Sequence, residues 1–164
     1  QEGSSFGVSR VAEAADFASA FEAAAAFGCD VLAETCVIGG EYTVPVLEDR
    51  ALPVIRLETP REFYDYTAKY EADSTQYICP AGLPLAQERR AGALALQAFA
   101  ALGASGWARV DFFIDTVGNI QLIELNTVPG MTDHSLVPMS AAHEGISFQQ
   151  LVVRILGTSL GQRT

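Results

Sequence analysis

The first clear pattern of apolar positions runs from residue 12 to residue 27, where alanine dominates and a few bulky side chains recur. Phe17, Phe21 and Ala25 follow one another at intervals of four, and the acidic residues Asp16 and Glu22 fall on other sides. This spacing predicts an amphipathic helix. Gly28 is expected to end it, because glycine accepts the left-handed conformation that follows many helices.

A second long helix is predicted between Pro84 and Gly103. Proline suits the first turn of a helix, where its missing N–H is not needed, and glycine suits the position after the last turn. The apolar face that we expect this helix to bury consists of Leu94, Ala98 and Leu102.

The last predicted helix has a complete start signal. Ser147 stands as its N-cap with Gln150 three residues later, and Ile146 precedes the cap where it is placed to pack on Leu151. The stripe expected in the core is Phe148, Val152 and Ile155.

Three runs rich in β-branched and aromatic residues predict strands at residues 30–38, 41–47 and 51–57. Gly39 and Gly40 separate the first two runs, and the polar residues 48–50 separate the second from the third. These separators predict two hairpin-like connections between antiparallel neighbours. Together with the helices, the strands indicate an α+β fold.

Residues 107–126 read as a strand, a turn at 116–119 and a returning strand. With a loop of two or four residues, Asp111 lies opposite Glu124 and Arg109 lies opposite Asn126, so all four share one face. A three-residue loop would shift the register by one and send Glu124 to the other face. The first register is the one we predict.

Two carboxylates directly across a strand pair repel each other, so this arrangement needs a reason. A divalent cation supplies one, because two acids and an amide offer the hard oxygen ligands that suit Mg²⁺. The alternative is a solvated outer face with polar residues at its strand ends. Asn126 and the neighbouring Arg109 favour the metal site over that alternative.

Two further polar segments bear on phosphate binding. The stretch "EGSSFG" frames Ser4 and Ser5 with glycines, and its backbone N–H groups and hydroxyls are either a phosphate cradle or a plain turn. Residues 60–83 show no period and predict a long ordered loop, which carries Lys69 among several tyrosines. That cation is either a solvated charge or part of a lid over phosphate.

Composition and charge exclude several classes of function. The 164 residues are 49% hydrophobic with a formal charge of −10, which opposes binding to nucleic acid, and the apolar runs are too short for a membrane span. Three cysteines without a metal or redox spacing indicate buried thiols in a reducing cytosol. The chain lacks both an initiator methionine and a signal peptide, so we expect it to begin within a longer protein.

Together these residues resemble the ATP-grasp superfamily, and within it the C-terminal half of the D-alanine–D-alanine ligases. The resemblance covers essentially residues 1–164 as one ATP-grasp portion that is incomplete at its N-terminus. It is carried by the segments "EGSSFGVSRV", "FYDYTAKY", "TQYICPAGL", "GWARVDFFID", "IELNTVPGMTDHSLVPM" and "SFQQLVVRIL".

The resemblance implies a cytoplasmic, ATP- and Mg²⁺- (or Mn²⁺-) dependent ligase that joins two D-alanine molecules through an acyl phosphate for peptidoglycan precursor synthesis. Asp111, Glu124 and Asn126 match the family's metal ligands, and Arg109 matches the residue that holds the transferred phosphoryl group. Gly130 matches a backbone donor to the oxyanion of the tetrahedral intermediate.

The remaining site residues are also implied by the resemblance. Ser135 and the backbone of Leu136 match the positions that hold the carboxylate of the second D-alanine. Lys69 matches a contact to the transferred phosphate, and Ser4 and Tyr70 match a hydrogen-bonded pair that closes the lid. Glu34 and Glu41 match positions that face adenine and ribose, although Thr35 and Cys36 beside Glu34 depart from many relatives.

The family often forms homodimers, so we expect the full-length protein to be one. Groups that anchor ATP and the first D-alanine would precede Gln1, and we therefore expect residues 1–164 alone to be inactive. Two other interpretations stay open: a different carboxylate–amine ligase, and a non-catalytic domain that binds only nucleotide or metal.

Overall fold

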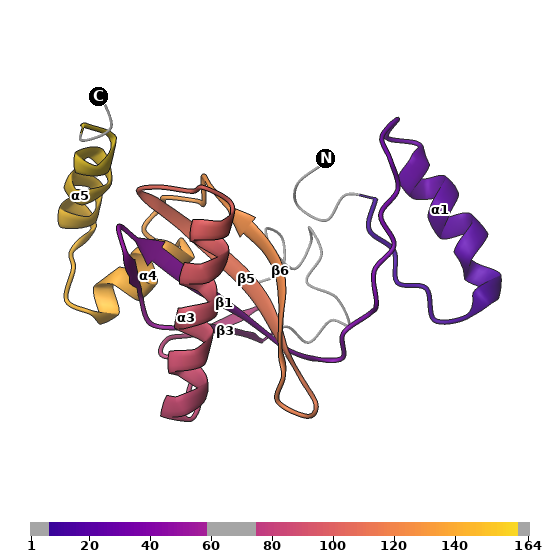
Figure 1. Ribbon diagram of the computed structural model, residues 1–164, viewed down its shortest axis with the longest axis horizontal. Coiled ribbons are helices and arrows are strands. Elements are labelled where there is room, and N and C mark those ends of the chain that lie inside the picture. Colours follow the sequence, from indigo (N-terminus) through magenta and orange to yellow (C-terminus); the bar gives the residue numbers. More distant parts are fainter. Residues whose placement is uncertain (1–6, 59–74, 161–164) are drawn as a thin grey trace. The chain divides into compact units, whose positions relative to one another are not determined.

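The computed structural model describes residues 7–58 and 75–160 (Figure 1). The chain divides into two compact units. The first comprises Gln1–Val37 and Thr59–Thr75, and the second comprises Ile38–Glu58 and Gln76–Thr164. Each unit is described separately.

The first unit contains the N-terminal helix that the sequence predicts. A 3₁₀ turn at Ala14–Asp16 leads into α1, Phe17–Ala25, and Gly28 follows with a φ of +71°. The helix is thus confirmed, although it is shorter than residues 12–27. The rings of Phe17 and Phe21 stack on each other with centroids 6.3 Å apart, yet each side chain stays about half exposed.

The strand predicted at residues 30–38 is wrong. These residues form no strand and most are exposed, including Leu32 and Ile38. The predicted turn at Gly39 and Gly40 is wrong as well, because both residues lie inside the first strand. A Cβ atom on Gly39 would come within 1.9 Å of the backbone oxygen of Ile114, so glycine is required there by a close strand approach.

The second unit is built on an antiparallel sheet of six strands. They are β1 (Gly39–Leu47), β2 (Arg50–Ala51), β3 (Ile55–Glu58), β4 (Gln76–Ile78), β5 (Trp107–Asp115) and β6 (Ile120–Asn126). The order across the sheet is β4-β3-β1-β5-β6, and β2 pairs with β1. The strand β1 therefore lies beside β5, which carries two of the predicted site residues.

The connection predicted at residues 48–50 is confirmed as a tight hairpin. Leu47 pairs with Arg50, and Glu48 adopts a positive φ of 60° between them. The prediction of a continuous loop at residues 60–83 needs a correction, because β4 lies within that range and pairs with β3. The rest of the range up to residue 74 lies outside the described residues.

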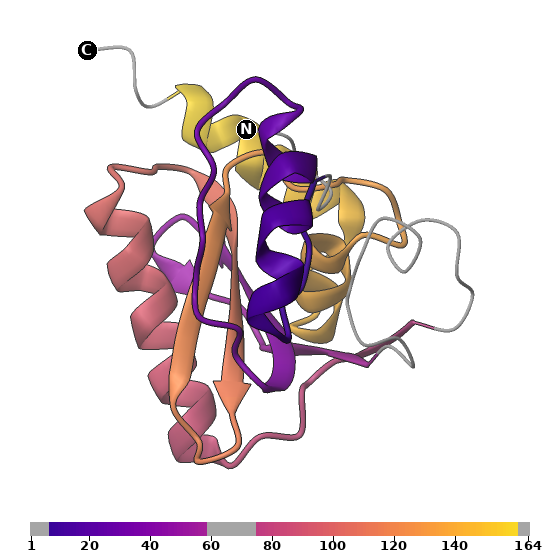
Figure 2. The ribbon, with the colours of Figure 1, turned by 90° about the vertical axis from the view of Figure 1, so that its right-hand side faces the viewer.

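One face of the sheet is covered by α3, Leu85–Ala101, which begins after Pro84 and ends before Gly103 as predicted (Figure 2). The buried face differs from the predicted one. It consists of Ala91, Ala95 and Phe99, whereas Leu102 is 70% exposed. The two stripes lie side by side on an alanine-rich helix, and the small side chains of Ala91 and Ala95 allow the closer approach to the sheet.

Two further helices, α4 (Leu136–His143) and α5 (Phe148–Leu160), pack through a second core cluster. Leu47 and Trp107 belong to this cluster, whereas their neighbours on the same strands belong to the core under α3. Because successive strand residues point to opposite faces, the second cluster lies on the other side of the sheet (Figure 2). The helix α4 was not predicted.

The start signal of α5 is confirmed in full. The backbone N–H of Ser147 donates to Gln150 Oε1 at 2.8 Å, and the N–H of Gln150 donates to Ser147 Oγ at 3.3 Å. Ile146 and Leu151 both join the second cluster, as the staple requires. The predicted core stripe is only partly right. Ile155 packs against the second cluster and Val152 is half-buried, but Phe148 is 40% exposed and the fully buried residue is Leu151.

Within the described part of the chain, no helix has the length and apolar character needed to cross a membrane.

Candidate active site

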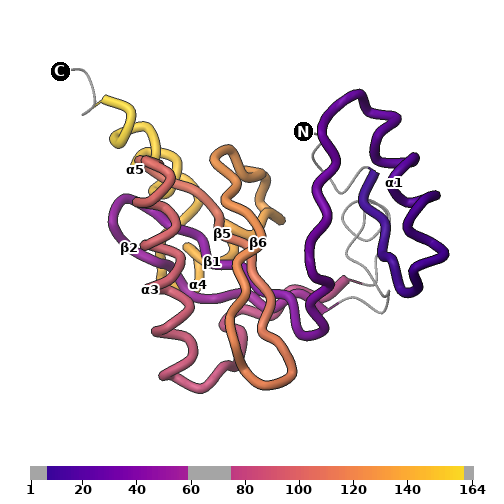
Figure 3. The backbone as a smooth tube through the Cα atoms, turned by 45° about the vertical axis from the view of Figure 1, so that its right-hand side comes forward, coloured from indigo at the N-terminus to yellow at the C-terminus, as the bar shows by residue number. Residues whose placement is uncertain are grey.

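The strands β5 and β6 form the hairpin that carries the predicted site (Figure 3). Its ladder combines the two registers that were considered from the sequence. Near the turn, Ile114 pairs with Ile120 and Phe112 with Leu122, which is the register of a three-residue loop. An irregularity then follows in the ladder, and Asp111 pairs with Glu124. The predicted pairing is confirmed, but the predicted loop length is wrong, and a β-bulge at Ile123 reconciles the two.

The turn is closed by the side chain of Asp115. Its Oδ1 accepts hydrogen bonds from the backbone N–H groups of Asn119 at 2.7 Å and Val117 at 3.0 Å. These bonds favour the charged carboxylate, and the backbone donor of Asn119 contributes most to lowering the pKa of Asp115. Gly118 supplies the positive φ of 90° that the last loop residue needs.

The bulge decides which face the second carboxylate joins. Val110 and Phe112 are buried in the core under α3, so the residue between them, Asp111, points to the opposite face. Residues paired across a ladder share a face, and Glu124 therefore joins Asp111. Asn126 joins Arg109 in the same way. The four residues lie together as predicted.

The carboxylate of Asp111 is held by two neighbours. Arg109 donates from Nε to Oδ1 at 2.8 Å and from Nη2 to Oδ2 at 2.7 Å, a paired contact in which both side chains are largely buried. Thr43 donates from Oγ1 to Oδ1 at 2.6 Å. Thr43 was not predicted as a site residue, because only the pairing of β1 with β5 brings it opposite Asp111.

The other two polar residues of this face are held less tightly. Asn126 Oδ1 accepts a hydrogen bond from the backbone N–H of Val128 at 3.1 Å, which orients the amide at the end of β6. Glu124 is exposed. Its carboxylate is therefore open to solvent and to a ligand on this side of the sheet.

A second group of candidate residues surrounds the start of α4. Ser135 is the N-cap residue of this helix and Leu136 is its first residue. Ser135 Oγ accepts a hydrogen bond from the N–H of Thr132 at 2.9 Å. A Cβ atom on Gly130 would lie 2.9 Å from Ser135 Oγ, so the hydroxyl packs directly on the glycine and leaves no room for a side chain.

The remaining predicted residues are Ser4, Glu34, Glu41, Lys69 and Tyr70. Ser4, Lys69 and Tyr70 lie outside the described residues. Glu34 is exposed in the first unit, and Glu41 lies on β1 of the second unit, paired with Phe113.

The donor set on this face fits a hard divalent cation. Asp111 and Glu124 supply carboxylate oxygens and Asn126 supplies an amide oxygen, which are the ligand types that Mg²⁺ takes along with waters and phosphates. Among residues 7–58 and 75–160, no group of three or more His, Cys, Asp or Glu side chains is placed to hold a metal. A cation here would therefore take the amide oxygen of Asn126 as a ligand beside the two carboxylates.

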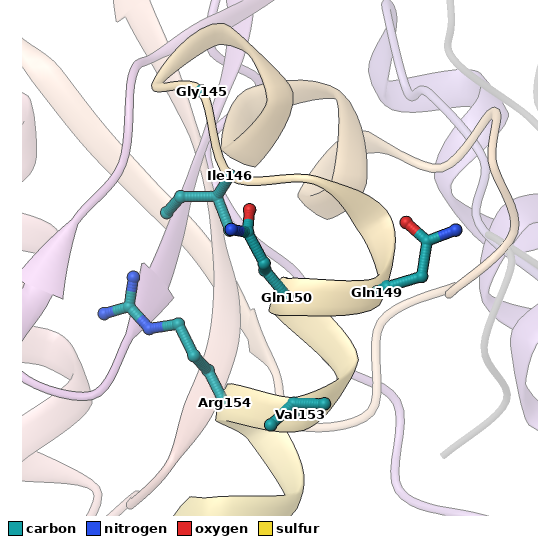
Figure 4. Close-up of a pocket in the computed structure, with 6 residues that line it drawn as sticks. All are labelled: Gly145, Ile146, Gln149, Gln150, Val153 and Arg154. Carbon is teal, nitrogen blue, oxygen red and sulfur yellow. The ribbon is translucent and has the colours of Figure 1, made fainter.

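A shallow hollow of about 500 Å³ lies beside α5, lined by Gly145, Ile146, Gln149, Gln150, Val153 and Arg154 (Figure 4). Gln150 in this hollow is occupied by the capping contact to Ser147. Arg154 is paired with Glu48 at 2.7 Å. None of the candidate site residues lines the hollow, so it is separate from the site on the sheet.

Comparison with protein families gives an independent result. The family described as the D-ala D-ala ligase C-terminus matches residues 1–157. The D-alanine–D-alanine ligase of Halorhodospira halophila is 55% identical over 160 residues, which are 98% of this chain and 53% of the relative. The ligase of Nitrosococcus oceani is 53% identical over 163 residues, 99% of this chain and 52% of the relative.

Solved structures agree with these relatives. The D-alanine–D-alanine ligase from Bacillus anthracis complexed with ATP superposes with a TM-score of 0.78 at 30% identity, covering 90% of this chain and 47% of that one. The VanG D-Ala:D-Ser ligase from Enterococcus faecalis superposes with a TM-score of 0.82 at 35% identity, covering 95% and 46%.

The predicted α+β ATP-grasp fold is thereby confirmed. The chain spans about half the length of the curated relatives it matches. By the match over residues 1–157 and by these relatives, the chain belongs to the family of D-alanine–D-alanine ligase C-terminal domains.

Proposed function

We propose that this chain forms the C-terminal catalytic portion of an ATP- and Mg²⁺-dependent ligase that joins two D-alanine molecules. The observation that carries the proposal is the polar face of the β5–β6 hairpin, where Arg109, Asp111, Glu124 and Asn126 lie together. Such a face suits a phosphoryl-transfer enzyme, which works mainly by positioning and by neutralising charge.

The proposed reaction has two steps. The carboxylate of the first D-alanine attacks the γ-phosphorus of ATP, and the bond to the β-phosphate oxygen breaks to give an acyl phosphate and ADP. The amine of the second D-alanine then attacks the acyl carbon and loses a proton, and the bond from carbon to the phosphate oxygen breaks. The products are D-alanyl-D-alanine, ADP and inorganic phosphate.

Asp111, Glu124 and Asn126 would hold the magnesium ions in this proposal. When bound, Mg²⁺ or Mn²⁺ neutralises the phosphate oxygens and orients them for in-line transfer. Arg109 would turn its guanidinium from Asp111 toward the transferred phosphoryl group. Its planar group offers several N–H donors, so it can contact a phosphate oxygen while keeping one bond to Asp111.

The segment around α4 would receive the second amino acid. Ser135 Oγ and the first N–H groups of α4, beginning at Leu136, offer donors for a carboxylate at the positive end of the helix. The backbone N–H of Gly130, packed beside Ser135, would donate to the oxyanion that forms as the amine attacks.

The proposal also assigns roles to the remaining predicted residues, and a place in the cell to the protein. Lys69 would contact the transferred phosphate, and Ser4 and Tyr70 would close the lid over the site. Glu34 and Glu41 would contact the adenosine. We also propose that the full-length protein is a cytoplasmic homodimer that acts in peptidoglycan precursor synthesis. Size-exclusion chromatography with light scattering measures its molar mass in solution and so tests whether it is a dimer.

The test is a product assay with ATP, Mg²⁺ and D-alanine on the purified full-length protein that contains this chain, since residues 1–164 alone are expected to be inactive. ADP, phosphate and dipeptide should appear in equal amounts, and Asn126→Ala should lower the turnover strongly. ADP release without dipeptide would overturn the proposal in favour of another carboxylate–amine ligase or a plain nucleotide-binding domain.

The choice of the second substrate needs its own comparison, because one of the similar structures is a D-Ala:D-Ser ligase. D-alanine, D-serine and D-lactate should be supplied as competing acceptors, with the products separated by mass. We expect D-alanine to be preferred. A preference for D-serine would keep the reaction type and change the acceptor.

A further inference from the structure

A buried hydroxyl lies beside the predicted metal-binding carboxylate. Thr43 is 1% exposed in the middle of β1, and Ser140 is the only other polar residue that is buried to this degree in residues 7–58 and 75–160. A buried hydroxyl costs free energy unless it is hydrogen-bonded, and valine would fill the same space without that cost. The hydroxyl of Thr43 therefore needs a reason beyond packing.

Strand pairing supplies the reason. Thr43 pairs with Asp111 across β1 and β5, and Asp111 pairs in turn with Glu124 across β5 and β6. The three residues form one row on the site face of the sheet. The Thr43 hydroxyl has a single proton, and its shorter contact, 2.6 Å, is to Asp111 Oδ1, whereas the oxygen of Val110 lies 3.2 Å away.

The donors are divided unequally between the two oxygens of Asp111. Oδ1 accepts from both Thr43 and Arg109 Nε. Among the described residues, Oδ2 accepts only from Arg109 Nη2. Because a carboxylate oxygen has two lone-pair positions, Oδ1 is fully used while Oδ2 keeps one position open.

We propose that Thr43 is a positioning residue of this site, which holds Asp111 Oδ1 from within the sheet and thereby presents Oδ2 to a divalent cation. This inference rests on the proposed function, because it takes Asp111 as a metal ligand. Residues that orient a ligand typically change metal affinity by about 10- to 100-fold when they are removed.

Thr43 can hold Asp111 throughout the reaction, whereas Arg109 cannot. Arg109 would turn toward the phosphoryl group, and its contacts to Asp111 would then loosen. Thr43 is fixed by the backbone of a central strand and has no second task. It remains the donor that holds Oδ1 of Asp111 in place.

The test measures metal affinity instead of turnover. Mn²⁺ binding to the purified full-length protein is followed by electron paramagnetic resonance of free Mn²⁺, with and without a non-hydrolysable ATP analogue. Thr43→Val removes the hydroxyl and keeps the shape, and Thr43→Ser restores the hydroxyl. We expect Thr43→Val to weaken Mn²⁺ binding by about 10-fold or more and Thr43→Ser to stay within about 3-fold of the wild type.

A matched control separates positioning from general damage. Ser140→Ala removes the other buried hydroxyl, whose bond goes to the backbone oxygen of Pro53 at 2.7 Å, away from the acids. It should lower the thermal unfolding temperature much as Thr43→Val does, without a change in Mn²⁺ affinity. Equal losses of affinity in Thr43→Val and Ser140→Ala would overturn the proposal.

Asp111→Asn distinguishes the failure of this inference from that of the proposed function. If the wild type binds Mn²⁺ and Asp111→Asn loses it while Thr43→Val keeps it, then Asp111 is a ligand and Thr43 does not position it. If Asp111→Asn binds Mn²⁺ as the wild type does, both the metal site and the inference are overturned.

Discussion

Glu124→Gln should have opposite effects on stability with and without metal. Like charges directly opposite in an antiparallel ladder destabilise it by roughly 0.2–1 kcal/mol. Glu124 is exposed and Arg109 already balances Asp111, so we expect about 0.5 kcal/mol, at the lower part of that range. In a protein of this size that is about 1–2 °C in the unfolding temperature, in favour of the glutamine variant.

Bound metal should reverse the order of the unfolding temperatures of the wild type and Glu124→Gln. A ligand at a hundredfold excess over its Kd stabilises the folded state by about 2.7 kcal/mol, and the wild type should gain that amount from Mg²⁺ with a non-hydrolysable ATP analogue. Glu124→Gln loses a charged ligand and should gain much less. Because the wild type starts about 0.5 kcal/mol below the variant, it should then unfold at the higher temperature by at most about 2 kcal/mol, or roughly 4–8 °C.

The assay is thermal unfolding at low ionic strength, first with EDTA and then with Mg²⁺ and the analogue. Glu22→Gln serves as the matched control, because it removes the same charge from the exposed surface of α1. The control should unfold at the same temperature as the wild type in both conditions. A lower unfolding temperature for Glu124→Gln in EDTA, or an equal response to Mg²⁺, would refute the reasoning.

Three further changes test other contacts. Arg109→Lys replaces a planar group that binds Asp111 through two hydrogen bonds. This change should lower kcat by about 100- to 1,000-fold in the ligase assay, and an unchanged kcat would contradict the role proposed for Arg109. Ser147→Ala removes the cap of α5 and should cost about 1 kcal/mol in urea unfolding, whereas Ser159→Ala in the last turn should cost much less. The hydrogen bond from Arg154 holds the pKa of Glu48 below its ordinary value of 4.5, so this pair stabilises the fold above that pH and the stabilisation is lost as the pH falls through the lowered pKa. Glu48→Gln should unfold at a slightly lower temperature than the wild type at pH 7 and should match it well below pH 4.5; a constant difference would show that the charge is not responsible.

The sequence alone determined the elements whose signals are local. The cap at Ser147 and Gln150 and the glycines after α1 and α3 act within a few residues, so the ends of these helices could be predicted. The acids and the amide of β5 and β6 were also found from the sequence, because period-two alternation assigns strand residues to faces.

Tertiary structure decided which apolar stripe is buried and which strand exists. On α3 two adjacent stripes are apolar, and only contact with the sheet selects Ala95 over Leu102. Residues 30–38 have the composition of a strand but pair with no strand among residues 7–58 and 75–160, and their backbone is irregular. Composition cannot report whether a partner strand is present.

The register of the site hairpin shows where local rules end. The three-residue turn closed by Asp115 would by itself send Glu124 to the face under α3. The bulge at Ile123 returns Glu124 to the face of Asp111. It leaves one residue of β6 unpaired, so that polar side chains stay on the site face and apolar side chains stay on the face under α3. Thr43 reaches Asp111 only through a strand pairing 68 positions apart in the sequence, which no local pattern encodes.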